Sequence, residues 1–131
     1  MEPIKKTEEQ WKQELGEEKY RILRQGGTEP AYTGEYFKEH AKGVYKCAAC
    51  GQELFSSDTK FDSDTGWPSF TEAMNRENVD LVADNSHGMT RVEVRCKRCG
   101  SHLGHVFNDG PKDKGGKRFC INSACLKLQK N

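Results

Sequence analysis

The sequence lacks a long hydrophobic run and has few apolar residues for its length. Of its 131 residues, 34% are hydrophobic and 31% are charged. A membrane-spanning helix needs about 20 consecutive apolar residues, and no stretch approaches that length. The first residues, Met1–Lys6, run into charge without the apolar stretch of a signal peptide. We therefore expect a cytoplasmic protein with no membrane partner.

A strong excess of one charge is also missing. The chain carries 21 Lys and Arg against 20 Asp and Glu, a net charge of +1. Proteins that bind nucleic acid usually show a basic excess, so we expect no nucleic-acid partner. A chain of this length is typical of one domain, and we expect residues 1–131 to form a single monomeric domain. Because its core would be lean, a bound metal would help to stabilise it.

Residues 1–30 have the pattern of a helical N-terminal arm. Thr7–Gln10 has the sequence of a capping box and opens a helix that Gly16 interrupts. Glu17–Arg24 is expected to form a second helix, which Gly26-Gly27 ends. We expect this arm to pack on a β structure formed by the rest of the chain.

Short runs of alternating residues predict β-strands beyond the arm. They lie at Gly43–Cys47, Leu54–Phe55, Lys60–Phe61, Val79–Ala83, Thr90–Cys96 and Lys117–Leu126, with a helical turn at Thr71–Glu77. In the strand of Thr90–Cys96, Val92 and Val94 should face inward. Glu93 and its neighbours Arg91 and Arg95 should face outward. Short strands separated by Gly, Asn and Asp turns favour an antiparallel β sandwich or barrel.

Four of the six cysteines form two matching Cys-x-x-Cys-Gly motifs. Each motif brings two thiolates to one centre, and its glycine lets the backbone fold around that centre. Together they supply the four ligands of a structural Zn²⁺ site, Cys47, Cys50, Cys96 and Cys99. Redox-active pairs are the alternative. Two motifs that both end in glycine and follow no βαβ unit favour a closed metal site, which stabilises the fold and does not catalyse.

Cys120 lies on the predicted strand Lys117–Leu126 and has no partner by spacing. Alternation on a strand places Arg118, Cys120 and Asn122 on one face, and mostly apolar residues on the other. Lys117 and Arg118 would favour the thiolate, which is the reactive form, and Asn122 could bind a substrate. These residues alone support a reactive thiol and a buried, inert one about equally.

Two histidines, His102 and His105, follow the second cysteine motif. On a regular strand they would point to opposite faces, but Gly104 permits a bulge that could turn both toward one pocket. There they would supply protons, because imidazole titrates near neutral pH. His40 and His87 are expected to be exposed.

Two further side chains have a structural and a functional interpretation. Cys125 would share the apolar strand face and is interpreted as a small buried hydrophobic residue. It should not pair with Cys120, because five residues along a strand span about 16 Å, beyond the Cα separation of about 7 Å that a disulfide tolerates. Trp67, between Gly66 and Pro68, is either a packed core residue or the apolar wall of a substrate pocket.

Taken together, these residues resemble the B-type methionine sulfoxide reductases, which reduce the R epimer of methionine sulfoxide. The resemblance runs through most of residues 33–126. The matching segments are Cys47–Gly51, Phe61–Ser63, Gly66–Phe70, Cys96–Gly100, Ser101–Phe107, Asp109–Pro111 and Arg118–Ser123. It implies a fold of two antiparallel sheets with N-terminal helices and one structural Zn²⁺.

The resemblance also implies a chemistry. Cys120 would be the nucleophile, which attacks the sulfoxide sulfur and becomes a sulfenic acid. His102, His105 and Asn122 would bind the sulfoxide, and one histidine would protonate its oxygen. The substrate would be methionine R-sulfoxide in proteins or peptides.

Trp67 would hold the S-methyl group of the substrate, and Arg118 would lie beside the thiolate. Many family members place a resolving cysteine two residues before this tryptophan, where this chain has Thr65. We therefore predict a one-cysteine enzyme whose sulfenic acid is reduced by thioredoxin, glutathione or another thiol. The rival hypothesis is a zinc-stabilised binding module in which Cys120 only packs.

Overall fold

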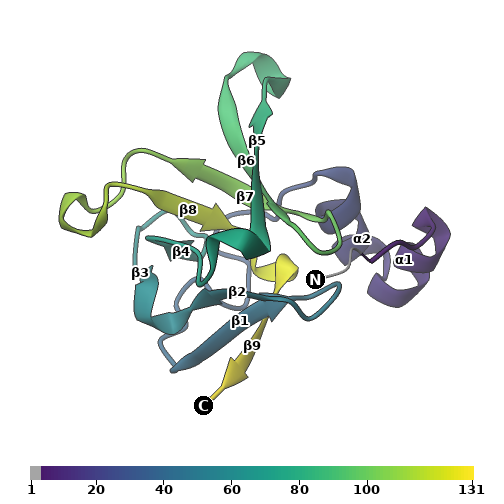
Figure 1. The fold of residues 1–131 in the computed structure, drawn as a ribbon, viewed down its shortest axis with the longest axis horizontal. Helices are drawn as coiled ribbons and strands as arrows, with labels where there is room; N and C mark the ends of the chain where they lie inside the picture. The colour runs from purple at the N-terminus through teal and green to yellow at the C-terminus, as the bar shows by residue number, and fades with distance from the viewer. Residues whose placement is uncertain (1–3) are drawn as a thin grey trace.

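The computed structural model describes residues 4–131 and contains two antiparallel sheets and two N-terminal helices (Figure 1). The helices are α1 (Glu8–Leu15) and α2 (Glu17–Gln25). The strands are β1 (Gly43–Cys47), β2 (Glu53–Ser56), β3 (Lys60–Phe61), β4 (Ser69–Phe70), β5 (Val79–Asp84), β6 (Arg91–Cys96), β7 (His102–Phe107), β8 (Arg118–Ile121) and β9 (Leu126–Lys130). The predicted fold class is confirmed.

In the helical arm, α1 is capped at its start, and a glycine ends each of the two helices. The Thr7 side chain accepts a hydrogen bond from the Gln10 backbone at 3.1 Å, and Gln10 accepts one from the Thr7 backbone at 2.9 Å. Gly16 separates the helices, and Gly26, in the left-handed conformation, ends the second one. Trp11 is buried and joins the core cluster. Among the described residues, no helix has the length and hydropathy to span a bilayer.

The smaller sheet has the strand order β2-β1-β9, so the last strand pairs with the first one (Figure 1). Tyr45 of β1 and Phe55 of β2 are fully buried and meet Phe70 of β4, which belongs to the larger sheet. The ring centroids lie 5.2 Å apart for Tyr45 and Phe70, and 4.5 Å apart for Phe55 and Phe70. Aromatic pairs at such distances add about 0.5–1.5 kcal/mol to the gain from burial. A small aromatic core therefore joins the two sheets.

The larger sheet has the order β3-β4-β8-β7-β6-β5. Its register places five residues directly opposite one another across neighbouring strands, which we call the Cys120 row. They are Ser69, Cys120, His105, Glu93 and Val82. Residues opposite one another in antiparallel strands share a face and have Cβ atoms about 4.5–5.5 Å apart. The register therefore places Cys120 next to His105 in the middle of the sheet.

The predicted bulge in β7 is present. Val94 of β6 pairs with Gly104, but the next residue, Arg95, pairs with His102. Leu103 is therefore the extra residue of the bulge. As a result His102 and His105 come close to each other, with ring centroids 5.5 Å apart. The expectation that the bulge would turn both rings toward one pocket is met only in part, because His105 lines the pocket beside Cys120 and His102 does not.

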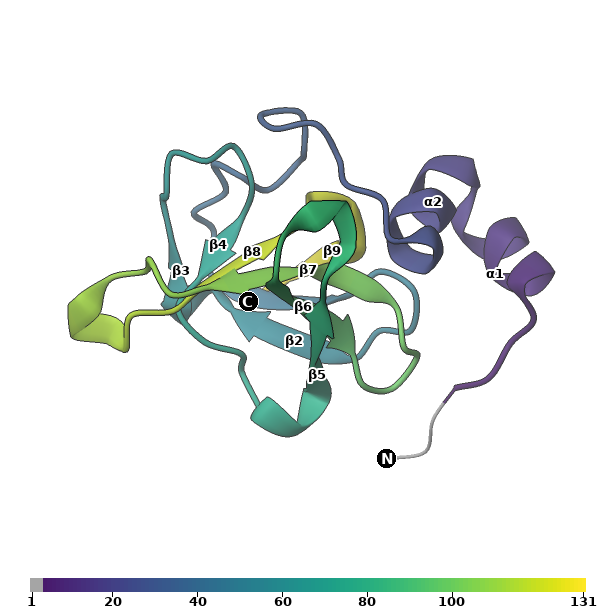
Figure 2. The same cartoon turned by 90° about the horizontal axis from the view of Figure 1, so that it is seen from above.

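The inward and outward pattern predicted for β6 is only partly right. Val94 is fully buried as expected, but Val92 is 38% exposed. The hairpin of β5 and β6 extends past the rest of the sheet, so less of the core covers this end (Figures 1 and 2). Glu93, expected outside, is only 9% exposed, because it lies in the Cys120 row and bonds to His102.

The single strand predicted over Lys117–Leu126 is wrong. β8 ends before Asn122, a short 3₁₀ turn (η5, Ser123–Cys125) follows, and the chain continues as β9. Both the backbone N–H and the side-chain amide of Asn122 donate to the carbonyl of Leu103, at 3.0 and 3.1 Å, and they hold this break. Cys125 therefore leaves the pleat of β8. It is fully buried, as predicted for a small hydrophobic residue.

The helical turn predicted over Thr71–Glu77 is displaced toward the C-terminus. The observed 3₁₀ turn spans Arg76–Asn78, and the Asn75 side chain caps it by accepting from the Glu77 backbone at 2.9 Å. The short strand β4, which the sequence patterns did not indicate, precedes it.

Gly104→Ala tests how closely β7 approaches β8. A Cβ atom at this position would overlap the carbonyl oxygen of Cys120, which cannot move without breaking the pairing of the strands. Overpacking of this kind costs about 1–3 kcal/mol, so we expect a lower free energy of unfolding in a denaturant titration. Asp80→Ala, at an exposed position of β5, is the control and should behave as the wild type. Wild-type stability of Gly104→Ala would contradict this register.

Candidate active site and metal centre

The four predicted metal ligands lie together. Their sulfur atoms are all within 4.8 Å of one another. Cys47 Sγ lies 3.7 Å from Cys99 Sγ, and Cys50 Sγ lies 3.6 Å from Cys96 Sγ. The six cysteines of the described chain all carry free thiols. Neither motif forms its own disulfide in this structure, as the redox alternative would require.

The spacing of the thiols fits a tetrahedral metal ion. Zinc–sulfur bonds of about 2.3 Å in a tetrahedron place the sulfur atoms about 3.8 Å apart, close to the observed separations of 3.6 and 3.7 Å. Gly51 and Gly100 follow the motifs with φ of 82° and 76°, a conformation that glycine adopts readily. Each donates its N–H back to the first cysteine of its motif, at 2.8 and 2.7 Å. The four thiols therefore fit a structural metal site.

This site connects both sheets and the helical arm. Cys47 ends β1 in the smaller sheet, and Cys96 ends β6 in the larger one. Arg24 of α2 donates to the Cys99 carbonyl at 2.7 Å, and its guanidinium lies over the ring of Trp11 in α1 at 4.9 Å. Metal binding would therefore stabilise contacts between parts of the chain that are far apart in sequence.

A pocket of about 180 Å³ opens beside Cys120. The predicted site residues that line it are Cys120, His105, Trp67, Arg118 and Asn122. The remaining lining residues are Thr28, Thr65, Arg91, Gly104, Phe107 and Ile121. A pocket with apolar walls and a few convergent polar groups is typical of a ligand site. Its volume suits a single amino-acid side chain better than a large ligand.

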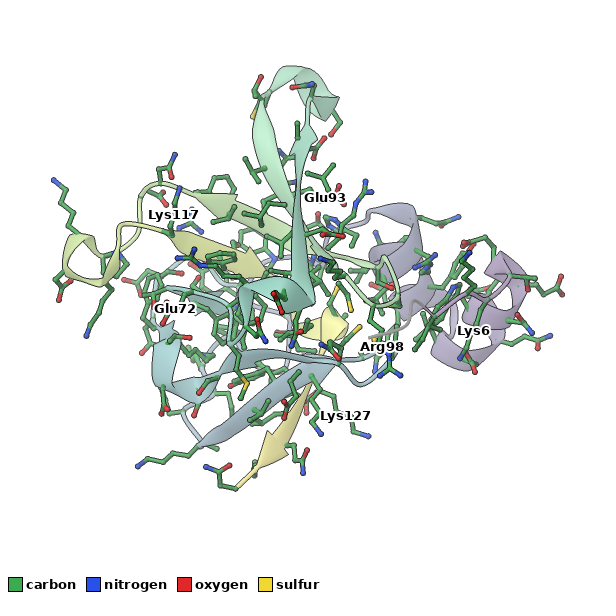
Figure 3. The ribbon with its side chains drawn as sticks, viewed as in Figure 1. Lys6, Glu72, Glu93, Arg98, Lys117 and Lys127 are labelled. Carbon is green, nitrogen blue, oxygen red and sulfur yellow. The ribbon has the colours of Figure 1, made fainter. Side chains whose placement is uncertain are left out.

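Cys120 is half-buried in this pocket. Burial raises the pKa of its thiol above the ordinary value, and the Arg118 guanidinium opposes this by favouring the thiolate. Arg118 donates two hydrogen bonds to the Asp109 carboxylate, at 2.9 and 3.2 Å, and lies 4.7 Å from the centre of the Phe107 ring. Lys117, also expected to favour the thiolate, is exposed and bonds to the loop after β7 (Figure 3).

Each of the two predicted histidines is held by a carboxylate from the β5–β6 hairpin. His105 Nε2 lies 2.8 Å from Asp84 Oδ2, and His102 Nδ1 lies 2.6 Å from Glu93 Oε2. Figure 3 labels Glu93 beside this hairpin. Hydrogen bonds from Ser86 and His105 hold the pKa of Asp84 well below its usual range. Both carboxylates therefore stay ionised at neutral pH and accept from the imidazole rings.

Glu93 and His102 form a buried pair of an ionised carboxylate and a neutral imidazole. Burial raises the pKa of Glu93, but hydrogen bonds from Arg95 and His102 outweigh it and leave the pKa below the ordinary value. Burial lowers the pKa of His102, and Glu93 offsets this only in part. With its Nδ1–H donated to Glu93, neutral His102 has an unprotonated Nε2. Among the described residues, this buried Nε2 has no hydrogen-bond partner.

Glu29 links the Trp67 loop to Asn122. Its carbonyl accepts from Trp67 Nε1 at 3.0 Å, and its N–H donates to Asn122 Oδ1 at 3.0 Å. Glu29 as a whole is 5% exposed, and its carboxylate accepts a hydrogen bond from the Ala124 backbone N–H at 2.9 Å. Trp67 is half-buried at the pocket and lies outside the core cluster of the described residues. This position favours the interpretation of Trp67 as a pocket wall.

The other predicted residues are placed as follows. Asn122 borders the pocket but is 3% exposed, and Leu103 and Glu29 engage its amide. His40 is exposed, pairs with Asp62 at 3.0 Å and does not line the pocket beside Cys120. The side chain of His87 lies outside the described residues.

Sequence reasoning missed Asp84, Glu93 and Glu29 as parts of the site. Asp84 follows the strand predicted to end at Ala83, and Glu93 was expected on the outside of a strand. The signal that could have found Glu93 is the pairing of β6 with β7, the strand that carries both histidines, because this pairing places an acidic residue opposite an imidazole. Glu29 has no comparable local signal, since its role depends on contacts between distant segments.

Comparison with known proteins identifies the family. Residues 15–130 match the SelR domain. The chain belongs to the SelR domain family. A peptide methionine sulfoxide reductase MsrB from Leptospira interrogans is 58% identical over 127 residues, which cover 97% of this chain and 96% of the relative. A protein of the same name from Thiobacillus denitrificans is 61% identical over 121 residues, which cover 92% of this chain and 91% of the relative.

A solved structure shares the fold of this SelR domain at low sequence identity. The crystal structure of the Mis18 'Yippee-like' domain matches with a TM-score of 0.54 and 18% identity, covering 69% of this chain and 97% of that chain. At this identity the likeness concerns the fold alone.

Cys99→Ser tests the metal site directly. Removing one of four thiolates should abolish binding, so elemental analysis should find about one metal equivalent per wild-type chain and well below one in the variant. Cys125→Ser is the matched control, because it removes a buried thiol outside the cluster, and it should retain the metal. Equal metal content in all three proteins, or none in the wild type, would contradict the site.

Proposed function

We propose that this SelR domain is a peptide-methionine (R)-S-oxide reductase with Cys120 as its nucleophile. The observation that carries the proposal is one pocket that holds a thiol, an imidazole and an aromatic wall, from Cys120, His105 and Trp67. Family membership and relatives named peptide methionine sulfoxide reductase MsrB support it. The substrate would be methionine R-sulfoxide in peptides or proteins.

The two ends of the sulfoxide would meet different walls of the pocket. The S-methyl group would pack on the ring of Trp67, whose indole N–H is already bonded to Glu29. The sulfoxide oxygen would point toward the histidine side of the Cys120 row, and Asn122 would contribute from the edge of the pocket. Arg118, close enough to favour the thiolate, would oppose the effect of burial on the nucleophile.

The reaction transfers an oxygen atom to Cys120. The thiolate attacks the sulfoxide sulfur, an acid protonates the oxygen, and methionine leaves while Cys120 becomes a sulfenic acid. The substrate sulfur gains two electrons and the Cys120 sulfur loses two. The oxygen and one proton finish on the sulfenic acid, so the step needs no further oxidant or reductant.

An external thiol would regenerate the enzyme. Thr65, at the position where the family resemblance places a resolving cysteine, lines the pocket and bonds to Ser63 at 2.8 Å. A hydroxyl cannot form a disulfide, and Cys125 is fully buried in the core. Thioredoxin, glutathione or another thiol would attack the sulfenic acid, release water and form a mixed disulfide, which a second thiol reduces. We propose that the enzyme acts as a cytoplasmic monomer.

Zinc is the metal that we propose for the four-cysteine site. Four thiolates in a closed tetrahedron are the usual ligand set of structural Zn²⁺. The residues that would hold it are Cys47, Cys50, Cys96 and Cys99. Such a site stabilises the fold, and the reaction above draws nothing from it.

Cys120→Ser separates a reductase from a zinc-stabilised binding module. Reduction of dabsyl-methionine R-sulfoxide with dithiothreitol should fall to background, because serine is a far weaker nucleophile. Metal content and thermal unfolding should stay close to those of the wild type. Cys125→Ser, the matched control, should keep measurable activity. Activity retained by Cys120→Ser would contradict Cys120 as the nucleophile, and activity absent from the wild type would favour the binding module.

A further inference from the structure

Residues 28–32, which we call the strap, bond to the loop that carries Trp67. The Tyr32 N–H donates to the Gly66 carbonyl at 2.9 Å. Trp67 Nε1 donates to the Glu29 carbonyl at 3.0 Å. The strap therefore holds both the backbone of the loop and the indole ring that forms one wall of the pocket.

The Glu29 side chain anchors the strap to the turn that follows β8. Its Oε1 accepts a hydrogen bond from the backbone N–H of Ala124, in η5, at 2.9 Å. The backbone N–H of Glu29 donates to Asn122 Oδ1 at 3.0 Å. Glu29 is buried and does not line the pocket, so it acts on a bound substrate only through the residues that it holds.

The second carboxyl oxygen of Glu29 makes this position costly for the fold. Oε2 is buried, and among the described residues no group donates a hydrogen bond to it. It packs so closely against Gly34 that a Cβ atom there would overlap it. A buried acceptor without a donor lowers stability. Packing alone therefore does not account for a carboxyl group here, whereas the bond that Oε1 makes to Ala124 does.

We propose that Glu29 is a positioning residue that makes the pocket specific for an S-methyl sulfoxide. This rests on the proposed reductase function and deepens it. The carboxyl group fixes the strap to η5, the Glu29 carbonyl fixes the indole of Trp67, and the fixed ring limits the size of the alkyl group on the sulfoxide sulfur. Without the anchor, the ring shifts and the pocket admits a longer group.

The size of the alkyl group is a sensitive measure of where the wall lies. One extra methylene in an apolar pocket changes kcat/KM by roughly 10–200-fold. The ratio of kcat/KM for two substrates that differ by one methylene also cancels effects common to both. Burial is the main cause that raises the pKa of the Cys120 thiol, and Glu29 adds to it. A change in this pKa would act on both substrates alike and leave the ratio unchanged.

The test compares the R-sulfoxides of methionine and ethionine, which carry an S-methyl and an S-ethyl group, in otherwise identical peptides with dithiothreitol. We expect the wild type to prefer the methyl substrate about tenfold or more in kcat/KM, and Glu29→Ala to lose at least about threefold of this preference. Glu35→Ala, which removes an exposed glutamate just beyond the strap, is the matched control and should keep the wild-type ratio.

Three further variants separate positioning from a structural role. Glu29→Gln keeps an oxygen that accepts from the Ala124 N–H, so its ratio should stay within roughly twofold of the wild type. Glu29→Asp, one methylene shorter, withdraws the carboxyl group from Ala124 and should lose the preference. Trp67→Phe keeps a ring but lacks the indole N–H, and in this background Glu29→Ala should change the ratio little further.

The wild-type assay distinguishes the two levels of inference. A folded wild type that reduces neither substrate would overturn the reductase function and with it the role of Glu29. An active wild type without preference, or a Glu29→Ala variant with an unchanged ratio, would overturn the role of Glu29 alone. So would a Glu29→Gln variant that matches Glu29→Ala, or full additivity with Trp67→Phe. If Glu29→Ala does not fold, Glu29→Asp decides, and a wild-type ratio in that variant would contradict the anchor.

Discussion

The close pairing of β7 with β8 at Gly104 is the constraint on which the site depends. A side chain there would overlap the backbone at Cys120, so glycine allows the two strands to pair at this point. The register that results puts His105 beside Cys120 and Glu93 beside His105. The bulge at Leu103 then brings His102 to the same group. One backbone contact thus arranges a thiol, two imidazoles and a buried carboxylate from three strands.

A metal bound by the four cysteines would stabilise this arrangement from a distance. Cys47 ends β1, Cys96 ends β6, and Arg24 of the helical arm donates to the Cys99 carbonyl, so a bound ion would hold together the sheets that the aromatic core only partly joins. Only 34% of the residues are hydrophobic, so burial of apolar side chains stabilises this fold less than it would a richer core. Metal binding would add to the free energy of unfolding. The thiol of Cys120 is left out of the metal cluster and remains available for chemistry.

Features that local chemistry decides could be predicted from the sequence. The Thr7 cap, the glycines after the cysteine motifs and the bulge near Gly104 each follow from residues within a few positions of one another. These predictions also located most of the pocket, because the motif residues lie on neighbouring strands.

Features that depend on distant contacts could not be predicted in this way. Alternation placed Glu93 outside, because no local pattern shows that a histidine on the next strand will bond to it. The break at Asn122 depends on the Leu103 carbonyl, nineteen positions away, so the sequence alone suggested a longer strand. The same limit hid Glu29, whose contacts join the Trp67 loop to Asn122.

The fate of Cys120 after one turnover tests the central claim most directly. The fully reduced protein, free of added thiol, would be mixed with one equivalent of methionine R-sulfoxide peptide, treated with a sulfenic-acid probe and digested for mass spectrometry. We predict the probe on Cys120, one methionine formed per chain, and no cross-link between Cys120 and Cys125. Methionine formed with a Cys120–Cys125 disulfide, or with Cys120 unchanged, would contradict the one-cysteine mechanism.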